Sequence, residues 1–326
     1  MTTVVTAYFD LAKIEGTNRA NEIDYFQWAE ALMATDCDMV IFIDHHLYDR
    51  VLNMRGQYKH RTLIIPCSLD DIPTMQKGKY TETKHSTTNS KDTSLYKCLT
   101  WCKLDFIKMA IDMNPFNSRY FSWVDFGIFK VHRSNEMSFR IPQRDDQICL
   151  HEIIPTFQSD ISDLNSFYST FRHNIAGGYF SGSIESLTWF IDEFHRTLDE
   201  SISQGHRVHE QNLFGVIVAR NYDRIDFSFG DYSEILGNLA PSGIALHLEQ
   251  INKCMSLKRY DHALRRCQYL RSKVHEDDLF KVLDATFLSA YYSNRKDICS
   301  QIADEYLSSC PLEHRSRVQS NLRYIA

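Results

Sequence analysis

Short apolar runs alternate with helix-like segments over the first third of the chain. Three runs rich in β-branched and aromatic residues are typical of buried strands, at 3–9, 39–43 and 62–66. Residues 21–33 carry apolar side chains three and four positions apart, which predicts a helix, and 49–57 predicts a shorter one. Because strands and helices alternate, the pattern predicts a parallel sheet with right-handed crossovers.

A long predicted helix, 93–113, leads into the aromatic run Tyr120–Val124, which predicts a central buried strand. Asp125 follows that strand at once, and Gly127 lies two residues further on. An acidic residue at the carboxyl end of such a strand lies where open α/β sheets bind ligands. An isolated Asp-x-Gly also commonly caps a turn. Both interpretations are open at this point.

Glycines gather in 174–183, next to two aromatic residues. Gly177 and Gly178 predict either a tight turn or a close approach of the backbone to a ligand. A helix predicted from residue 184 would then direct its amino terminus to the same place. Further strands are predicted within 147–156 and 226–232, and further helices at 162–172 and 212–219.

The pattern changes near residue 243. No glycine follows it, and successive helical patterns reach almost to the end of the chain, at 244–255, 260–272, 279–293 and 297–309. The turn at 258–264 resembles that of a tetratricopeptide hairpin. We therefore expect a domain at 1–242 and a small all-α domain at 243–326, the latter a candidate protein-binding surface. The polar stretch 68–92 predicts a lid.

Composition narrows the class of protein. With 43% hydrophobic residues the 326-residue chain can bury a core, and a net charge of −6 argues against nucleic-acid binding. Nine cysteines without zinc-type spacing are expected to be reduced and buried. Neither a signal peptide nor a membrane-spanning run is evident, so we expect a soluble, cytoplasmic protein. Peripheral contact with a membrane stays open.

Acidic residues follow predicted strands or turns at three places, Asp44, Asp125 and Asp231. We expect them at one edge of the sheet. Diphosphate chemistry needs a divalent cation, and Mg²⁺ and Mn²⁺ prefer oxygen ligands. His45 and His46 are adjacent and would point to opposite sides of an extended segment, so we favour structural or solvent-facing roles for them.

Glu210 falls at a predicted helix start, between His209 and Gln211. Such a glutamate suits a base or an anchor for a substrate hydroxyl. It is equally an ordinary first-turn acid, which the helix dipole favours. The sequence contains no zinc-protease, P-loop, dinucleotide-binding or α/β-hydrolase motif, so those classes lose their usual support.

Taken in order, these segments resemble the HtrL/YibB proteins, which are similar to nucleotide-diphosphosugar transferases of the GT-A fold. The resemblance covers about residues 3–240. The segments that carry it are VVTAYFDL, MVIFIDHH, TLIIP, the stretch from LYKCLTWCKLDF to SWVDFGIF, IAGGYFSGS, HEQNLF and FSFGDY. The implied fold is a GT-A-like, mostly parallel mixed sheet flanked by helices.

The resemblance also implies roles for residues near the nucleotide. Ala7, Tyr8 and Arg19 would line the nucleotide end of the donor. Asp44 would contact the base or the ribose. Lys103 would face the diphosphate.

Nearer the reacting centre, Asp125 would stand at the D-x-D position that holds the metal and the diphosphate. Gly127, which replaces the second acid, is counted among the cofactor-binding positions, and Asp231 is the first candidate for the missing ligand. Four residues would lie around the sugar, the acceptor and the reacting carbon: Gly177, Gly178, Glu210 and Gln211.

The implied activity is glycosyl transfer from a nucleotide-diphosphate sugar to a hydroxyl of a glycan or glycoconjugate, with Mn²⁺ or Mg²⁺ as cofactor. Two other classes stay open. One is a sugar nucleotidyltransferase, although 10–19 has only one glycine where those enzymes carry a glycine-rich loop. The other is a catalytically degenerate scaffold that binds partners through its helical tail, which the single acid of WVDFG favours.

Overall fold

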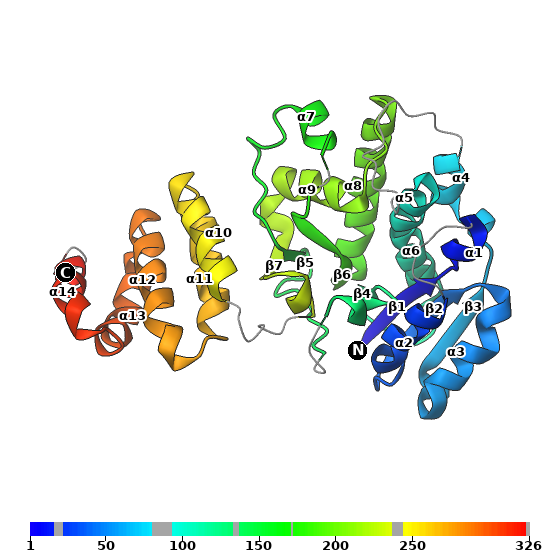
Figure 1. Cartoon of the computed structure of the whole chain (residues 1–326), viewed down its shortest axis with the longest axis horizontal. Helices are drawn as coiled ribbons and strands as arrows, with labels where there is room; N and C mark the ends of the chain where they lie inside the picture. The colour runs from blue at the N-terminus through cyan, green and yellow to red at the C-terminus, as the bar shows by residue number, and fades with distance from the viewer. Residues whose placement is uncertain (16–21, 80–92, 133–136, 171, 237–243, 324–326) are drawn as a thin grey trace. The chain divides into compact units, whose positions relative to one another are not determined.

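The computed structural model describes residues 1–15, 22–79, 93–132, 137–170, 172–236 and 244–323 (Figure 1). The chain divides into two compact units. The first comprises Met1–Ser228 with Ile235–Asn238, and the second comprises Phe229–Glu234 with Leu239–Ala326. The short segment after the last strand therefore belongs to the second unit. Each unit is described by itself.

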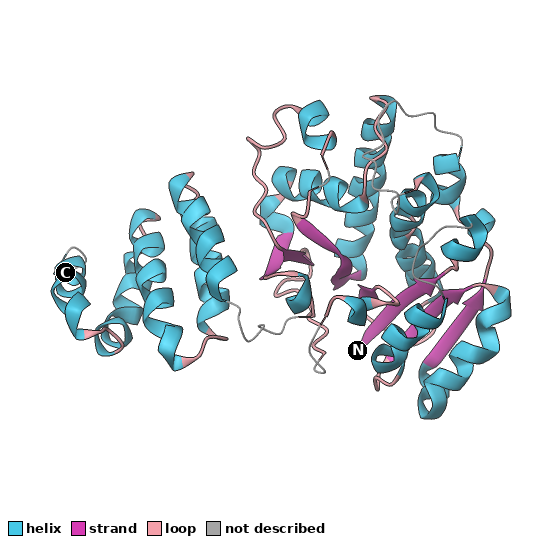
Figure 2. Cartoon of the chain, in the orientation of Figure 1, coloured by secondary structure: helices cyan, strands magenta, loops and turns pink. Residues whose placement is uncertain are grey.

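A seven-stranded sheet in the order β3-β2-β1-β4-β6-β5-β7 forms the centre of the first unit (Figure 2). β1, β2, β3 and β4 pair in parallel, while β6 runs antiparallel to both β4 and β5. The strands are β1 (Thr2–Tyr8), β2 (Asp38–Ile43), β3 (Thr62–Pro66), β4 (Tyr120–Val124), β5 (Ile148–Glu152), β6 (Ile175–Ser183) and β7 (Ile225–Phe229). The predicted α/β class, with a mostly parallel mixed sheet, is confirmed.

Helices cover both faces of this sheet (Figure 1). α6 packs on β1 and β4, α8 and α9 pack on β6, and α3 packs on β3. The helices are α1 (Leu11–Glu15), α2 (Glu22–Met33), α3 (Tyr48–Arg55), α4 (Pro73–Lys79), α5 (Ser94–Trp101), α6 (Lys103–Met113), α7 (Leu164–Tyr168), α8 (Ile184–Ser203) and α9 (Glu210–Arg220). The start of the predicted lid is helical, as α4, and residues 80–92 lie outside the described part.

The helix predicted over 93–113 is two helices. α5 ends at Trp101, Cys102 forms a turn between them, and Lys103 opens α6. The side chain of Lys103 is buried although it stands at a helix amino terminus, where the macrodipole disfavours a cation. Such a placement requires negative partners.

The glycine-rich segment 174–183 corrects an expectation. It is a strand, β6, and not a turn, and neither Gly177 nor Gly178 has a positive φ. Because β6 runs antiparallel to β4, Tyr179 pairs with Val124 and Ser183 with Tyr120. α8 therefore begins at the opposite end of β6, and its amino terminus does not point toward Gly177.

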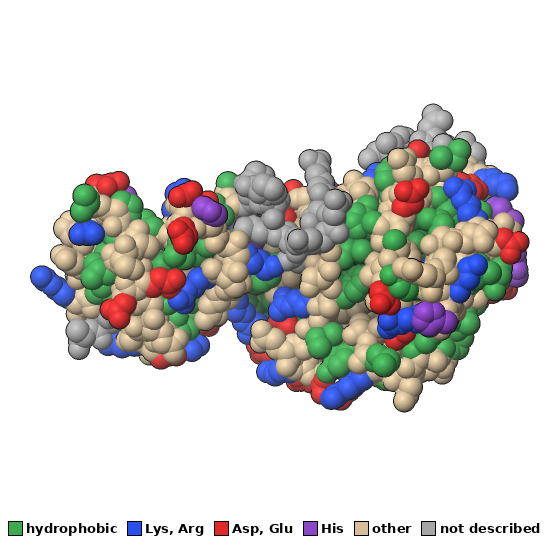
Figure 3. Space-filling view, turned by 90° about the horizontal axis from the view of Figure 1, so that it is seen from below, with side chains coloured by type: hydrophobic (Ala, Val, Ile, Leu, Met, Phe, Trp, Pro, Cys, Tyr) green, Lys and Arg blue, Asp and Glu red, His purple; other side chains and the backbone are tan. Residues whose placement is uncertain are grey.

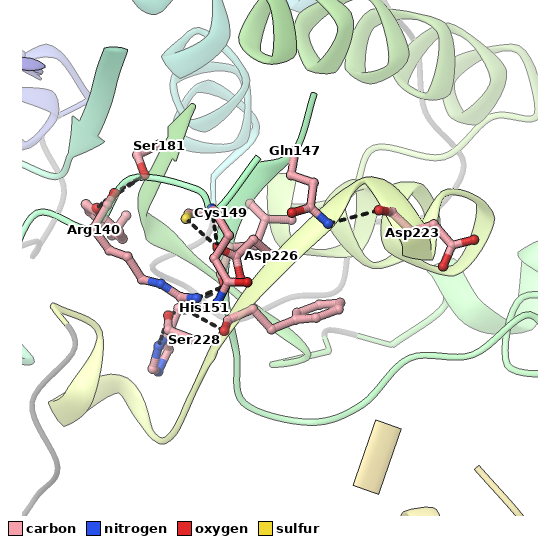
Figure 4. Close-up of polar contacts among 12 residues, drawn as sticks. Arg140, Gln147, Cys149, His151, Ser181, Asp223, Asp226 and Ser228 are labelled. Carbon is pink, nitrogen blue, oxygen red and sulfur yellow. Dashed lines mark hydrogen bonds and ion pairs between the residues drawn. The ribbon is translucent and has the colours of Figure 1, made fainter. Parts of the chain in front are cut away.

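β7 is fixed to its neighbours by polar side chains (Figure 4). The guanidinium of Arg140 donates to Asp226 Oδ1 at 2.6 Å and to the carbonyl of Phe227 at 2.5 Å. His151 Nδ1 lies 3.0 Å from Ser228 Oγ. These contacts join the edge strand β7 to β5 and to the segment that carries Arg140.

The second unit consists mainly of antiparallel helices that pack each on the next: α10 (Ile244–Ser256), α11 (Tyr260–Arg271), α12 (Glu276–Tyr292), α13 (Lys296–Ser308) and α14 (Arg315–Arg323). Two of its turns share one geometry. Lys258 and Asn294 both have positive φ, and the amide after each donates to a carbonyl five residues earlier at 2.8 Å. The four predicted helices are confirmed. α14 was missed because Val318 is its one buried side chain.

The nine cysteines are free and buried, as expected. Within the described residues, no helix is long and apolar enough to cross a membrane. Acidic and basic side chains are interspersed on the face of the molecule shown in Figure 3. That distribution is unlike the continuous basic stripe of a nucleic-acid-binding surface.

Candidate functional site

Lys103 is the centre of the candidate site. Its ammonium group lies 2.9 Å from Asp125 Oδ1, 3.0 Å from Glu210 Oε1 and 2.9 Å from the carbonyl oxygen of Gly177. An ammonium has three N–H donors, and all three have protein acceptors here. Lys103 was expected to face a diphosphate. In this structure it binds two carboxylates, and its role toward a diphosphate stays a prediction.

Asp125 is the exposed member of this group. Its side chain is 39% exposed, against 9% for Lys103 and 3% for Glu210. Oδ1 accepts from Lys103 and, at 2.7 Å, from the indole Nε1 of Trp123. Oδ2 receives no hydrogen bond from any residue in the described part of the chain. One oxygen of Asp125 is thus held by the protein, and the other is open.

Gly177 lies beside the carboxylate of Glu210, and Gly178 lies beside the carboxylate of Asp125. A Cβ on Gly177 would lie 2.1 Å from Glu210 Oε1, and one on Gly178 would lie 3.4 Å from Asp125 Oδ2. The amide of Asp125 also donates to the carbonyl of Gly178 at 2.9 Å. The absence of a side chain at 177 is what allows Glu210 to approach Lys103.

The charges of this group are mutually dependent. Burial is the largest single influence on Glu210 and would raise its pKa. The charges of Lys103 and His209 and the hydrogen bonds from Lys103 and Thr100 together outweigh burial, so the pKa is lowered. Burial would likewise lower the pKa of Lys103, but Asp125 and Glu210 raise it. At neutral pH Lys103 and Glu210 are therefore both charged.

This linkage predicts acid sensitivity. An unfolded glutamate titrates near about 4.3, and folded Glu210 titrates lower, so the unfolded chain binds more protons in acid. Lys103 contributes stability below about pH 10.4, and this contribution is lost only as the pH rises through its raised pKa. The pair should stabilise fully between about pH 5 and 10 and lose its contribution as the pH falls below about 4.3 and through the lowered pKa of Glu210.

The measurement is urea unfolding between pH 3 and 7 for wild type, Glu210→Gln and the exposed control Glu249→Gln. Below pH 5 the wild type should lose stability more steeply than Glu210→Gln, and Glu249→Gln should follow the wild type. Parallel pH curves for wild type and Glu210→Gln would contradict the assignment.

Residues expected at the nucleotide end lie at the same edge of the sheet. Tyr8 ends β1, and its ring stacks on Phe126 with centroids 5.1 Å apart. Asp44 follows β2, and its Oδ2 accepts from the amide of Asp10 at 3.3 Å. Ala7 is on β1, opposite Phe42 of β2. The carboxyl ends of β1, β2 and β4 thus bring these positions together.

Gly127 has a structural reason to lack a side chain. A Cβ there would lie 2.8 Å from the ring of Tyr25. Neither an aspartate nor any other side chain fits while Tyr25 keeps that position.

Three of the expected site residues are not placed in this group. Arg19 lies outside the described residues. Gln211 follows Glu210 in the first turn of α9. Asp231 belongs to the second unit, where its amide donates to Glu234 Oε2 at 2.7 Å and its Oδ1 accepts from the amide of Tyr232 at 2.7 Å. The roles given to them stay predictions.

Two contributors were missed by the sequence reasoning. Trp123 donates to Asp125, and Tyr25 covers Gly127. The first had a signal, because residues two apart on a strand share a face, so that Trp123 and Asp125 could have been paired. Tyr25 lies on α2, about a hundred positions from Gly127, and nothing in the sequence indicated that the two would be in contact.

Metal binding has limited support from the side chains alone. Among the described residues there is no group of three or more His, Cys, Asp or Glu that could hold an ion. Asp125 Oδ2 offers one carboxylate oxygen. Mg²⁺ commonly binds through one or two carboxylates together with waters and substrate phosphates, so a one-carboxylate site fits a cation that arrives with a diphosphate.

Comparison with known proteins gives a family. A search of curated proteins finds no match. Among solved structures, the apo form of mouse xyloside xylosyltransferase 1 is similar, with 8% sequence identity, 70% of this chain and 85% of that chain covered, and a TM-score of 0.38, too low to support an argument. The family model described as "Bacterial protein of unknown function (HtrL_YibB)" matches residues 1–239, most of the chain. The expected resemblance is thereby confirmed, and the chain belongs to the HtrL_YibB family.

Proposed function

We propose that this protein is a glycosyltransferase that moves a sugar from a nucleotide-diphosphate sugar to a hydroxyl of a glycan or glycoconjugate. The observation that carries the proposal is the partly exposed side chain of Asp125 at the carboxyl edge of the parallel strands, whose Oδ2 accepts no hydrogen bond from the described residues. Open α/β sheets bind their ligands at that edge. The motif resemblance to GT-A-fold transferases supports the same substrate class.

A divalent cation is part of the proposal for an electrostatic reason. The formal charges of Lys103, Asp125 and Glu210 sum to −1, so a diphosphate approaching Asp125 without a cation would meet a like charge. Mn²⁺ or Mg²⁺ held by Asp125 Oδ2 and the donor phosphates would supply stabilisation of the departing diphosphate. The protein's own part is to orient Asp125 through its contact with Lys103.

The proposed role of Asp125 predicts a loss of turnover. Asp125→Asn keeps the shape of the side chain but removes the charge that holds the cation, so release of nucleoside diphosphate should fall at least about 100-fold. Wild type and variant are incubated with a panel of nucleotide sugars, glycan acceptors and Mn²⁺. Asp112→Asn, on the exposed end of α6, is the control and should keep wild-type activity. Near wild-type release by Asp125→Asn would exclude the assignment.

The scaffold alternative has one observation in its favour. Gly127 stands where transferases with D-x-D carry a second acid, and the Tyr25 ring bars any side chain there. The helical second unit would then be the protein-binding surface. A sugar nucleotidyltransferase is tested separately, by incubating the protein with a sugar phosphate and each nucleoside triphosphate and measuring release of pyrophosphate.

A further inference from the structure

Asp125 is fixed at more points than its place after a strand requires. Its amide donates to Gly178, and its carbonyl accepts from the amide of Ile128, both at 2.9 Å. Oδ1 accepts two further bonds, from Trp123 Nε1 at 2.7 Å and from Lys103 Nζ at 2.9 Å. Rotation of the carboxylate would break both of these bonds. The direction of Oδ2 is therefore determined by the two donors on Oδ1.

Trp123 is itself held rigidly. It is 3% exposed, and its ring lies nearly parallel to those of Phe106 and of its cross-strand partner Phe180, with centroids 6.1 and 6.3 Å away and interplanar angles of 12° and 16°. Trp123 lies two residues before Asp125, so both side chains emerge on one face of the chain. The indole N–H thus has one available direction, and Asp125 lies in it.

We propose that Trp123 is a positioning residue, which with Lys103 locks Oδ1 of Asp125 so that Oδ2 is presented to the cation and diphosphate. This inference rests on the proposed function. The position has a single carboxylate, because Gly127 supplies no second acid. The orientation of one oxygen of Asp125 therefore decides how the cation and the diphosphate are held. Mutation of a residue that hydrogen-bonds to a metal ligand and orients it typically lowers metal affinity or activity 10- to 100-fold.

The test is binding, measured by calorimetry with Mn²⁺ and UDP and, in parallel, with Mn²⁺ and GDP. Trp123→Phe keeps an aromatic ring in the stack but removes the N–H donor. Its affinity should fall 10- to 100-fold relative to wild type. Trp189→Phe, on α8 at the other end of β6, is the matched control and should stay within about 3-fold. Lys103→Arg keeps a cationic donor and should bind better than Lys103→Met.

The outcomes separate this inference from the proposed function. Equal affinity of wild type and Trp123→Phe would overturn the positioning role and leave the transferase proposal standing. Absence of binding to the wild type with UDP, GDP and the other common nucleoside diphosphates would overturn both. If Trp123→Phe does not fold, a crystal structure of the wild type with Mn²⁺ and the bound nucleotide decides. Ligation through Oδ2, with Oδ1 still bonded to Trp123, supports the inference, and ligation through Oδ1 overturns it.

Discussion

Replacing Lys103 by methionine is expected to lower the free energy of unfolding by about 3–5 kcal/mol. Methionine fills a similar volume but removes the charge between Asp125 and Glu210. Asp125 is 39% exposed and can be solvated, whereas Glu210 is 3% exposed and would be left buried without a counter-charge. The loss therefore comes mainly from Glu210. It should appear as a lower midpoint of urea unfolding with an unchanged slope.

A second substitution shows which residue causes the loss of stability in Lys103→Met. In Lys103→Met/Glu210→Gln the buried charge is gone, so part of the lost stability should return, and a double-mutant cycle gives the coupling. Lys108→Met, which removes an exposed pair with Asp112 on the same helix, should change stability by no more than about 0.5 kcal/mol. A loss for Lys103→Met as small as that of the control would mean that the buried pair is not formed.

Gly177→Ala is expected to destabilise the protein by about 1–3 kcal/mol or more, because the added Cβ would lie 2.1 Å from Glu210 Oε1 and 2.9 Å from its Cδ. The Glu210 side chain cannot move away from this Cβ without losing its bond to Lys103. At Gly178 a Cβ would meet the tips of Ile128 and Ile235 at 3.0 Å, and such tips can move. Gly178→Ala, on the same strand, is therefore the milder control.

The clash predicted at position 177 can be tested by relieving it. In a Glu210→Ala background the side chain that Cβ would strike is absent, so Gly177→Ala should cost much less than in wild type. Chemical denaturation of the four proteins of this cycle gives the coupling free energy. Additive effects of the two substitutions would show that the glycine is needed for another reason.

The sequence predicted the part of the site that depends on strand order. Asp125 after β4, Asp44 after β2 and Tyr8 at the end of β1 are neighbours because parallel strands end at one edge, and the apolar runs revealed those strands. Lys103 and Glu210 were both named as candidates. Their contact was not predicted, because it joins residues 107 positions apart through the packing of α6 and α9 on the sheet.

Gly177 shows why the remainder could not be predicted. A glycine pair is most often a turn signal, since local preference favours turns. Here tertiary packing decides: the space beside Gly177 is filled by Glu210, and the strand continues through it. The segment Phe229–Glu234 is similar, because its place in the second unit depends on its packing with the helices. In both cases the partner lies far along the chain.

Nucleotide binding by wild type and Asp125→Asn tests the central claim most directly. Melting temperatures are measured with each of the common nucleoside diphosphates, with and without Mn²⁺. A ligand at 100 times its dissociation constant should add about 2.7 kcal/mol to the stability of the wild type. We predict a Mn²⁺-dependent rise with at least one nucleotide, and none for Asp125→Asn. No shift of the wild type with any nucleotide, with or without Mn²⁺, would contradict the account and favour a scaffold.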